Sequence, residues 1–250
     1  MLLKTTDERN KLKAFEILCN LIQSATHRKK LAKDGYFKMV YDAMQVGKVD
    51  DKTLDKLSWM TTLICFHPDM IEQIVSLKLL NFIIKLVDNK FPASVRSNAV
   101  LAISLLTYHE SLFNELINNG VIDIVMNLCM DQQGEMQVKQ FSTLALVHFA
   151  LSKQSINILI EKGIMDLFNS LGVIGDAQIQ TNVSWIFLAL CNNGITGKQM
   201  LINGITRDMF LVSCNPQFSQ IRHLVIAGFA ELGRCTDWAE QQENLHSGSL

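Results

Sequence analysis

The sequence has few of the residues that make turns. It contains 3 Pro and 13 Gly among 250 residues. All-β sandwiches and linker-rich proteins need more turn residues than this, so both classes are disfavoured. The length suits one elongated unit or two compact ones, and a hydrophobic fraction of 48% is enough for a large core.

The sequence also has no large excess of one charge and no long apolar run. The 23 Lys and Arg residues nearly balance the 24 Asp and Glu residues, which argues against a general nucleic-acid binder. No uncharged apolar run reaches the roughly 18 residues that a membrane-spanning helix needs. The start, Met1 to Lys4, lacks the long apolar core of a secretory signal.

The six Cys residues show no Cys-x-x-Cys pair and no regular spacing. They lie at Cys19, Cys65, Cys129, Cys191, Cys214 and Cys235. This scatter favours buried, reduced thiols in a cytosolic protein. A disulfide or zinc framework is the alternative.

The chain does contain a repeat. Six segments of eight residues align, beginning at residues 14, 57, 99, 142, 183 and 225, at intervals of 43, 42, 43, 41 and 42. Positions 1, 5 and 8 of a segment are mostly apolar, as Ala99, Ile103 and Leu106 illustrate. Spacings of four and three residues put them on one face of a helix. The pattern therefore predicts six copies of one helix.

A second column of residues lies between these segments. It consists of Gly35, Gly120, Gly163 and Gly204, while Leu79 fills the same place in the remaining copy. Gly tolerates a positive φ, so we expect a tight turn between two helices there and a different turn at Leu79. One unit is then a short helix, a turn, a longer helix, a polar link and a third helix. Such units must stack to cover their apolar faces.

The period, the Gly before the second helix and the apolar pattern of the third helix resemble the armadillo repeat over residues 10–234. The resemblance implies an all-α fold, a right-handed α-superhelical armadillo-repeat solenoid with about five three-helix repeats and an amino-terminal capping helix. We expect a single domain over residues 1–250. Its parts are a capping helix at 10–24, repeats at 25–66, 67–109, 110–151, 152–192 and 193–234, and a polar tail at 235–250, either frayed or forming a covering helix.

The resemblance also implies a non-enzymatic binding module with a concave groove lined by third helices. Helix geometry places position 3 of each segment about 200° from position 1, so positions 3 and 7 should face the groove. In importin-α-like proteins these columns are Trp and Asn, which bind basic peptides. Here Trp occupies position 3 in two of six copies and Asn position 7 in one, never on the same helix. This departure disfavours a nuclear-import receptor.

The predicted groove differs along the chain. Its basic residues lie at the amino end and its middle is rich in amides, unlike the long basic groove of β-catenin. Trp59 and Trp185 are the expected anchors, because pocketed aromatics contribute much of the binding energy. The alternative for both Trp residues, and for Leu101 and Leu144, is packing between repeats. The candidate groove residues are Lys13, Lys52, Lys56, Trp59, Leu101, Gln137, Gln140, Leu144, Gln178, Asn182 and Trp185.

Charge is distributed unevenly. Residues 1–56 hold 12 basic and 8 acidic side chains, and residues 57–250 hold 11 and 16. The densest basic run supplies a candidate patch for an anionic membrane or an acidic partner: His27, Arg28, Lys29, Lys30 and Lys33. A solvated helix surface without a partner is the alternative.

The sequence shows no recognisable set of catalytic residues. Asn192 to Lys198 contains a Gly-Lys pair but lacks the upstream Gly and the following Ser or Thr of a phosphate loop. His67 and His109 follow third helices at the same register and have no second ligand at metal spacing. We therefore expect no enzyme activity, no metal and no cofactor.

The length, repeat count and composition are similar to those of the apicomplexan "armadillo repeats only" proteins. That resemblance implies a scaffold on the cytosolic face of the rhoptry membrane, anchored by an acylated amino terminus, that recruits a myosin motor and an adaptor protein. The acylated Gly and Cys of that family match nothing here, so an anchor segment is expected to precede Met1 in the native protein. The alternative is a soluble cytoplasmic adaptor or chaperone that binds acidic or extended peptide segments. Neither hypothesis involves nucleic acid.

Overall fold

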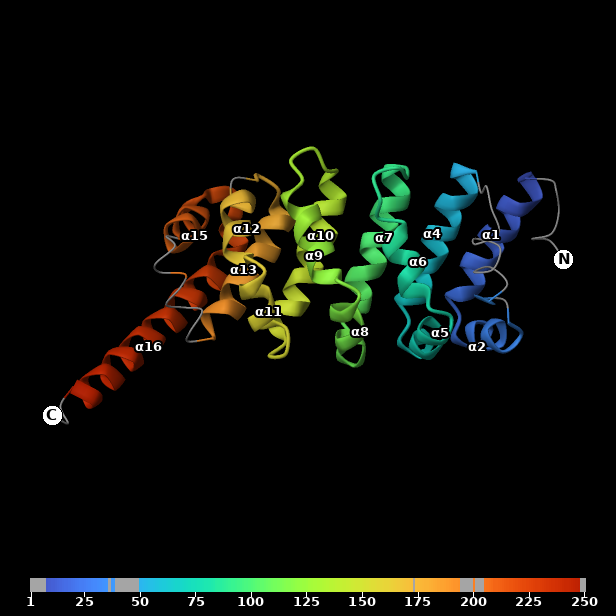
Figure 1. The fold of residues 1–250 in the computed structure, drawn as a ribbon. Helices are drawn as coiled ribbons and strands as arrows, with labels where there is room; N and C mark the ends of the chain where they lie inside the picture. The colour runs from blue at the N-terminus through green and yellow to red at the C-terminus, as the bar shows by residue number, and fades with distance from the viewer. Residues whose placement is uncertain are drawn as a thin grey trace. The chain divides into compact units, whose positions relative to one another are not determined.

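The structure is a computed structural model that describes residues 8–35, 37–38, 50–172, 174–193, 200 and 205–247. Every regular element among these residues is a helix (Figure 1). The contacts divide the chain into two compact units, Met1–Val121 and Ile122–Leu250. The boundaries of the individual repeats stay predictions.

In unit 1 the third helix of the repeat corresponds to α1, α4 and α7. These helices pack in chain order, α1 on α4 and α4 on α7 (Figure 1). Shorter helices connect them along the chain. The elements are α1 (Glu8–Ile22), α2 (Ala25–Lys33), α4 (Asp51–Cys65), η2 (Pro68–Met70), α5 (Ile71–Ser76), α6 (Leu79–Lys85), α7 (Ala93–Leu106), η3 (Glu110–Leu112) and α8 (Phe113–Asn118).

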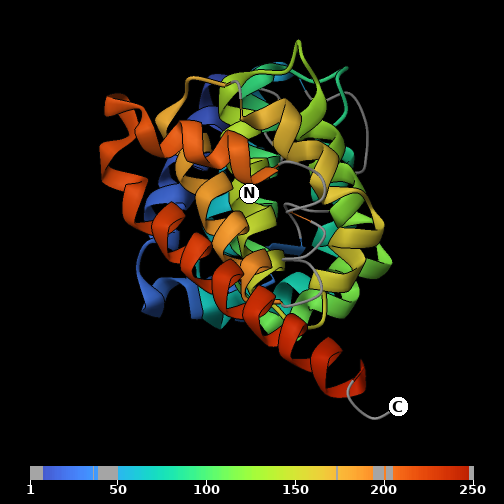
Figure 2. The ribbon, with the colours of Figure 1, turned by 90° about the vertical axis from the view of Figure 1, so that its left-hand side faces the viewer.

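Unit 2 repeats this plan, with α10 packed on α13 and α13 on α16. Its elements are α9 (Val121–Met130), whose first residue closes unit 1, α10 (Met136–Leu151), α11 (Ile156–Glu161), α12 (Ile164–Leu171), α13 (Ala177–Cys191), α15 (Ile205–Cys214), η4 (Pro216–Ile221) and α16 (Arg222–Ser247). The predicted polar tail continues α16 to Ser247, and Figure 2 shows this helix uninterrupted.

The apolar columns of the repeat form the core. Position 1 is buried in all six copies, including Leu57, Ala99 and Val183. Positions 5 and 8 are buried in the four middle copies. In the first and last helices Leu18, Leu21 and Phe229 are partly exposed, while Leu232 is buried. The structure thus confirms the helical face that the sequence spacing predicted.

Carboxylates fix where two third helices begin. Asp50 accepts a hydrogen bond from the Thr53 backbone N–H at 3.0 Å, and Asp176 accepts one from the Ile179 backbone N–H at 2.9 Å. Each satisfies an N–H that the first helical turn would leave without a partner. Asp50 and Asp176 are therefore the residues at which the polar link after the second helix gives way to the third helix.

The turn before the second helix is left-handed, as predicted, at Gly35, Gly120 and Gly163, whose φ values are 72°, 70° and 83°. The expectation of a different turn at Leu79 is wrong. Lys78, one residue earlier, adopts φ 52° and begins α6 as Gly163 begins α12. The repeat therefore keeps the same turn even where it lacks Gly. Gly204 lies outside the described residues.

Glycine also permits a close approach of helices in unit 2. A Cβ on Gly228 of α16 would lie 2.4 Å from Cε1 of Phe187 on α13. The Phe187 ring is fully buried, so it has no room to retreat. Position 4 of a third helix therefore faces the preceding third helix.

The cysteines are free thiols, as expected, in the described part of the chain. Cys19, Cys65, Cys129 and Cys191 are buried, and burial raises the pKa of the Cys65 and Cys129 thiols. Cys214 departs from the expectation, because it is exposed. The side chain of Cys235 lies outside the described residues.

Candidate functional site

The position-3 column reaches the surface in every copy. Trp59 is 41% exposed and Trp185 is 40% exposed, so neither is a fully buried packing residue. Glu16 is exposed, and Leu101, Leu144 and Ala227 are half-buried. The column therefore forms an accessible face on the third helices of each unit.

The position-7 column is only partly accessible. Asn20 is exposed and Leu105, His148 and Glu231 are half-buried, but Leu63 and Ala189 are buried. The accessible face is thus centred on position 3.

In unit 1 this face combines an aromatic side chain with cations. Lys13 and Lys52 are exposed, and Lys56 is half-buried, with its Nζ 4.0 Å from Oε1 of Glu16 on the neighbouring third helix. Trp59 and Leu101 supply apolar area on the adjacent helices α4 and α7. We call these five residues the unit 1 face.

In unit 2 the corresponding face is amide-rich. Gln137 and Gln178 are exposed, while Leu144 and Trp185 supply apolar area. Gln140 is half-buried and donates from Nε2 to Oδ2 of Asp176, the cap of α13, at 3.0 Å. Gln140 therefore links two third helices in addition to bordering the face.

Asn182 does not lie on the unit 2 face, contrary to prediction. It is 3% exposed, and its Nδ2 donates to the Gln140 carbonyl at 3.1 Å and to Thr143 Oγ1 at 2.9 Å. Its Oδ1 accepts from Gln178 Nε2 at 3.2 Å. Asn182 is a polar link between α10 and α13, because its amide nitrogen donates both hydrogen bonds to α10.

The same link recurs in unit 1. Asn98 Nδ2 donates to Ser58 Oγ at 3.0 Å, and Thr62 Oγ1 donates to the Asn98 carbonyl at 2.8 Å. Asn98 and Asn182 both lie one residue before position 1, and Ser58 and Thr143 both lie at position 2. Position 2 of a third helix therefore faces the following third helix.

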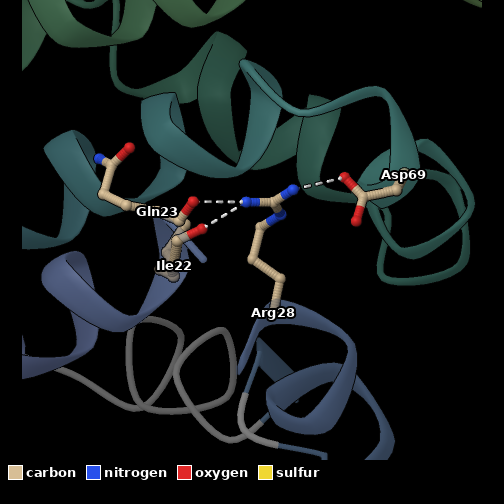
Figure 3. A network of polar contacts seen from close by, with 4 residues as sticks. All are labelled: Ile22, Gln23, Arg28 and Asp69. Atoms are coloured by element: carbon tan, nitrogen blue, oxygen red, sulfur yellow. Dashed lines mark hydrogen bonds and ion pairs between the residues drawn. The ribbon is translucent and has the colours of Figure 1, made fainter. Parts of the chain in front are cut away.

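Arg28 is not part of a surface patch, contrary to prediction. It is 7% exposed, and its Nη1 donates to the carbonyls of Ile22 at 2.8 Å and Gln23 at 3.1 Å (Figure 3). Its Nη2 lies 3.2 Å from Oδ1 of Asp69. Arg28 thus caps the carboxyl end of α1 and ties it to η2.

Helix geometry explains this exception. Four consecutive residues of an α-helix point in all directions around its axis, so one residue of a charged run must face inward. On α2 the inward residues are Arg28 and Leu31. His27, Lys29, Lys30 and Lys33 are exposed, so the basic patch consists of these four residues.

The two helix-end histidines begin the 3-10 helices that follow α4 and α7. His67 precedes η2, and His109 precedes η3. Burial lowers the pKa of both imidazoles, and the Arg28 cation lowers the pKa of His67 further, against the opposing effect of Asp69. Their shared register reflects shared loop structure.

The described residues contain no cluster of three or more His, Cys, Asp or Glu side chains that could hold a metal ion. In the same part of the chain, no helix is both long and apolar enough to cross a membrane. Most of the stretch that resembles a phosphate loop, residues 194–198, lies outside the described residues.

One polar column was missed in the sequence. Gln180, three residues before position 1, is fully buried and donates to the carbonyls of Leu171 at 2.9 Å and Ile174 at 2.7 Å. Arg222, at the same register, donates from Nε to the Ser213 carbonyl at 2.8 Å. Both side chains satisfy carbonyls at or just beyond the carboxyl ends of second helices. The signal in the sequence was a long polar residue at this register in five of the six copies: Lys11, Arg96, Lys139, Gln180 and Arg222.

Several solved structures with a similar fold are designed proteins. A computationally designed armadillo repeat protein for modular peptide recognition matches with a TM-score of 0.80 and 15% identity, covering 92% of this chain and 96% of that one. A designed armadillo repeat protein in complex with the peptide (KR)4 matches with a TM-score of 0.80 and 16% identity over the same shares. This chain has the armadillo-repeat fold.

At this identity the similarity to the designed armadillo proteins establishes the fold alone. No protein-family model and no curated protein sequence matches the chain. The binding properties of this armadillo chain must therefore be argued from its own side chains.

Proposed function

We propose that this chain is a non-enzymatic scaffold whose third-helix faces bind extended peptide segments of other proteins. The observation that carries the proposal is the partial exposure of Trp59 and Trp185 at the same register. A Trp side chain that remains 40% exposed on a rigid helix can bury a large area on contact with a ligand at little entropic cost. The peptide recognition described for the designed armadillo structures supports the same mode of binding.

The unit 1 face favours a particular ligand chemistry. Lys13, Lys52 and Lys56 supply cations, and Trp59 supplies an apolar anchor beside them. Such a face fits an acidic segment that carries a bulky apolar side chain. The unit 2 face, with Gln137 and Gln178 beside Trp185, fits a peptide backbone that pairs with side-chain amides.

The test is a selection of binders from a library of random 12-residue peptides, followed by titration of the best binder. Changing a contacted Trp59 or Trp185 to Ala should weaken binding by about 2 kcal/mol, roughly 30-fold in Kd. Tyr108→Ala is the matched control, because Tyr108 is an exposed aromatic residue outside the position-3 column.

Binding should also weaken in salt if the peptide is acidic and contacts unit 1. Peptides that bind the Trp59→Ala/Trp185→Ala double variant as tightly as the unchanged chain would refute the proposal. A selection that yields no binder would refute it as well.

The exposed basic patch of α2 supports a second candidate, a scaffold at the cytosolic face of an organelle membrane. Each Lys near an anionic bilayer contributes about 1 kcal/mol, enough to supplement a lipid anchor. The resemblance to the "armadillo repeats only" proteins would extend this candidate to the rhoptry surface, with a myosin motor and an adaptor protein as partners.

The second candidate predicts that Lys29→Glu/Lys30→Glu abolishes binding to vesicles containing phosphatidylserine. Arg28 must be left unchanged in this test, because it caps α1. Lys85→Glu, a charge reversal on the exposed end of α6, is the control. Equal vesicle binding by the patch variant and the control would remove the membrane role of the patch.

A further inference from the structure

The carboxyl-terminal repeat exposes three large apolar side chains. Phe210 and Leu211 of α15 are 58% and 56% exposed, and Ile226 of α16 is 57% exposed. End repeats of a solenoid normally present a polar outer surface. A buried core cluster of this repeat consists of Val212, Phe218, Ile221 and Leu224, and none of the three exposed residues belongs to it.

Ile226 lies at position 2, the position that faces a following third helix. Its counterparts Ser58 and Thr143 are buried and hydrogen-bonded to that helix. Among the described residues, no third helix follows α16. Ile226 therefore presents the surface that α4 and α10 cover with the following third helix of their own unit.

Phe210 of α15 extends this surface. Phe210 shares its register with Met126, which is buried, and with Ile84, which is half-buried. Leu211 shares its register with Lys85, Asn127 and Ser170, all exposed and polar. An absent neighbour explains the exposure of Phe210. The register of Leu211 stays exposed at Ser170 even though α12 packs on α15, so Leu211 lies beside this surface and is not part of it.

The amino-terminal end of the chain carries the complementary surface. Ile17 of α1 lies at position 4, which faces a preceding third helix, as Gly228 faces Phe187. Its counterparts Met60, Ala102 and Ile186 are at most 1% exposed, but Ile17 is 54% exposed. No third helix precedes α1 in the described part of the chain.

We propose that a second copy of this chain covers the carboxyl-terminal end, with α1 of one copy stacked on α15 and α16 of the other as a further repeat. The contact continues the interface that already joins third helices within each unit. Because the two surfaces differ, the contact is heterologous and leaves a free end on each copy. Copies then add head to tail as concentration rises.

The test is sedimentation of the full chain between about 1 and 200 µM, a range that brackets weak association. The unchanged chain should grow in mass beyond a dimer. Ile17→Asp and Ile226→Asp should each remain monomeric, because either change would bury an unpaired charge in the contact. An equimolar mixture of the two variants should form a dimer, since each supplies the end that the other has lost.

Val75→Asp places the same change on an exposed apolar residue of α5 and should associate like the unchanged chain. Phe210→Asp repeats the carboxyl-terminal test should Ile226→Asp perturb folding. A monomeric unchanged chain at 200 µM would overturn the proposal. Dimers formed by Ile17→Asp alone would also overturn it, because they would show a symmetric contact between carboxyl-terminal ends.

Discussion

Lys78 shows how a repeat can depend on a backbone conformation more than on the residue that usually supplies it. A non-glycine residue in the left-handed region costs about 1 kcal/mol. Lys78→Gly should therefore raise the free energy of unfolding by about 1 kcal/mol, measured by urea titration. Gly120→Ala is the opposite substitution and should lower the free energy of unfolding by a similar amount, because Gly120 has a φ of 70°. No steric clash should add to this cost, since a Cβ there meets no neighbour within 4 Å. Opposite signs from either variant would contradict the strain argument.

Arg28 is the residue whose role changed most between sequence and structure. Arg28→Ala would leave the Ile22 and Gln23 carbonyls without their donor and Asp69 without its cation. Hydrogen bonds that involve a charged group contribute about 1.5–3 kcal/mol, so the free energy of unfolding should fall by about 2 kcal/mol or more. Lys29→Ala, on the exposed side of α2, should change it by less than about 0.5 kcal/mol. Equal changes in the free energy of unfolding for the two substitutions would contradict a structural role of Arg28.

His67 and His109 make stability depend on pH. Because the pKa of each imidazole is lowered on folding, the unfolded chain binds more protons near neutral pH. Stability should therefore be full above about pH 7.5 and fall as the pH drops through about 6.5, the ordinary pKa of His. Asp50, whose pKa is lowered by its hydrogen bonds to Thr53, adds a loss only in the acid range near pH 4.

The His67→Gln/His109→Gln double variant is expected to have a flatter free energy of unfolding between pH 7.5 and 5.5. Urea titrations at several pH values measure this directly. An unchanged slope would show that other groups control the dependence.

At the scale of elements, an amide–hydroxyl pair joins neighbouring third helices in each unit. Asn182→Ala should lower the free energy of unfolding by about 2 kcal/mol, because it leaves buried partners unsatisfied. A double-mutant cycle with Thr143→Val should give a coupling of about 1 kcal/mol. Gln178→Ala, at an exposed partner of Asn182, is the control and should have a much smaller effect. Strict additivity of the Asn182 and Thr143 substitutions would show that their contact contributes nothing.

The elements were predictable because burial repeats with the helical period. Position 1 of each segment marks the buried face, and the recurring Gly marks a left-handed turn. The polar links were not predictable, because Asn182 finds its partners 39 and 42 residues earlier in the chain. Sequence spacing predicts the helix face on which an amide lies but not whether the amide bonds to the preceding helix. The accessible position-3 column, in contrast, followed from helix geometry alone.

At the scale of the whole molecule, stacked repeats should respond locally to damage. In a solenoid each repeat contacts chiefly its neighbours, so its stability depends mainly on them. Arg28→Ala should accelerate amide hydrogen exchange first in α1, α2 and α4, and Asn182→Ala first in α10 and α13. Mass spectrometry of exchanged peptides measures both patterns. Uniform acceleration along the chain by either variant would contradict local coupling.

The central claim is that the third-helix faces bind extended peptides. The most direct measurement is photo-crosslinking of a selected peptide to the full chain, with the attachment sites mapped by mass spectrometry. The account predicts attachment around Trp59 on α4 or Trp185 on α13, and loss of attachment when the contacted Trp is replaced by Ala. Attachment confined to the second helices α6, α9, α12 or α15 would contradict it.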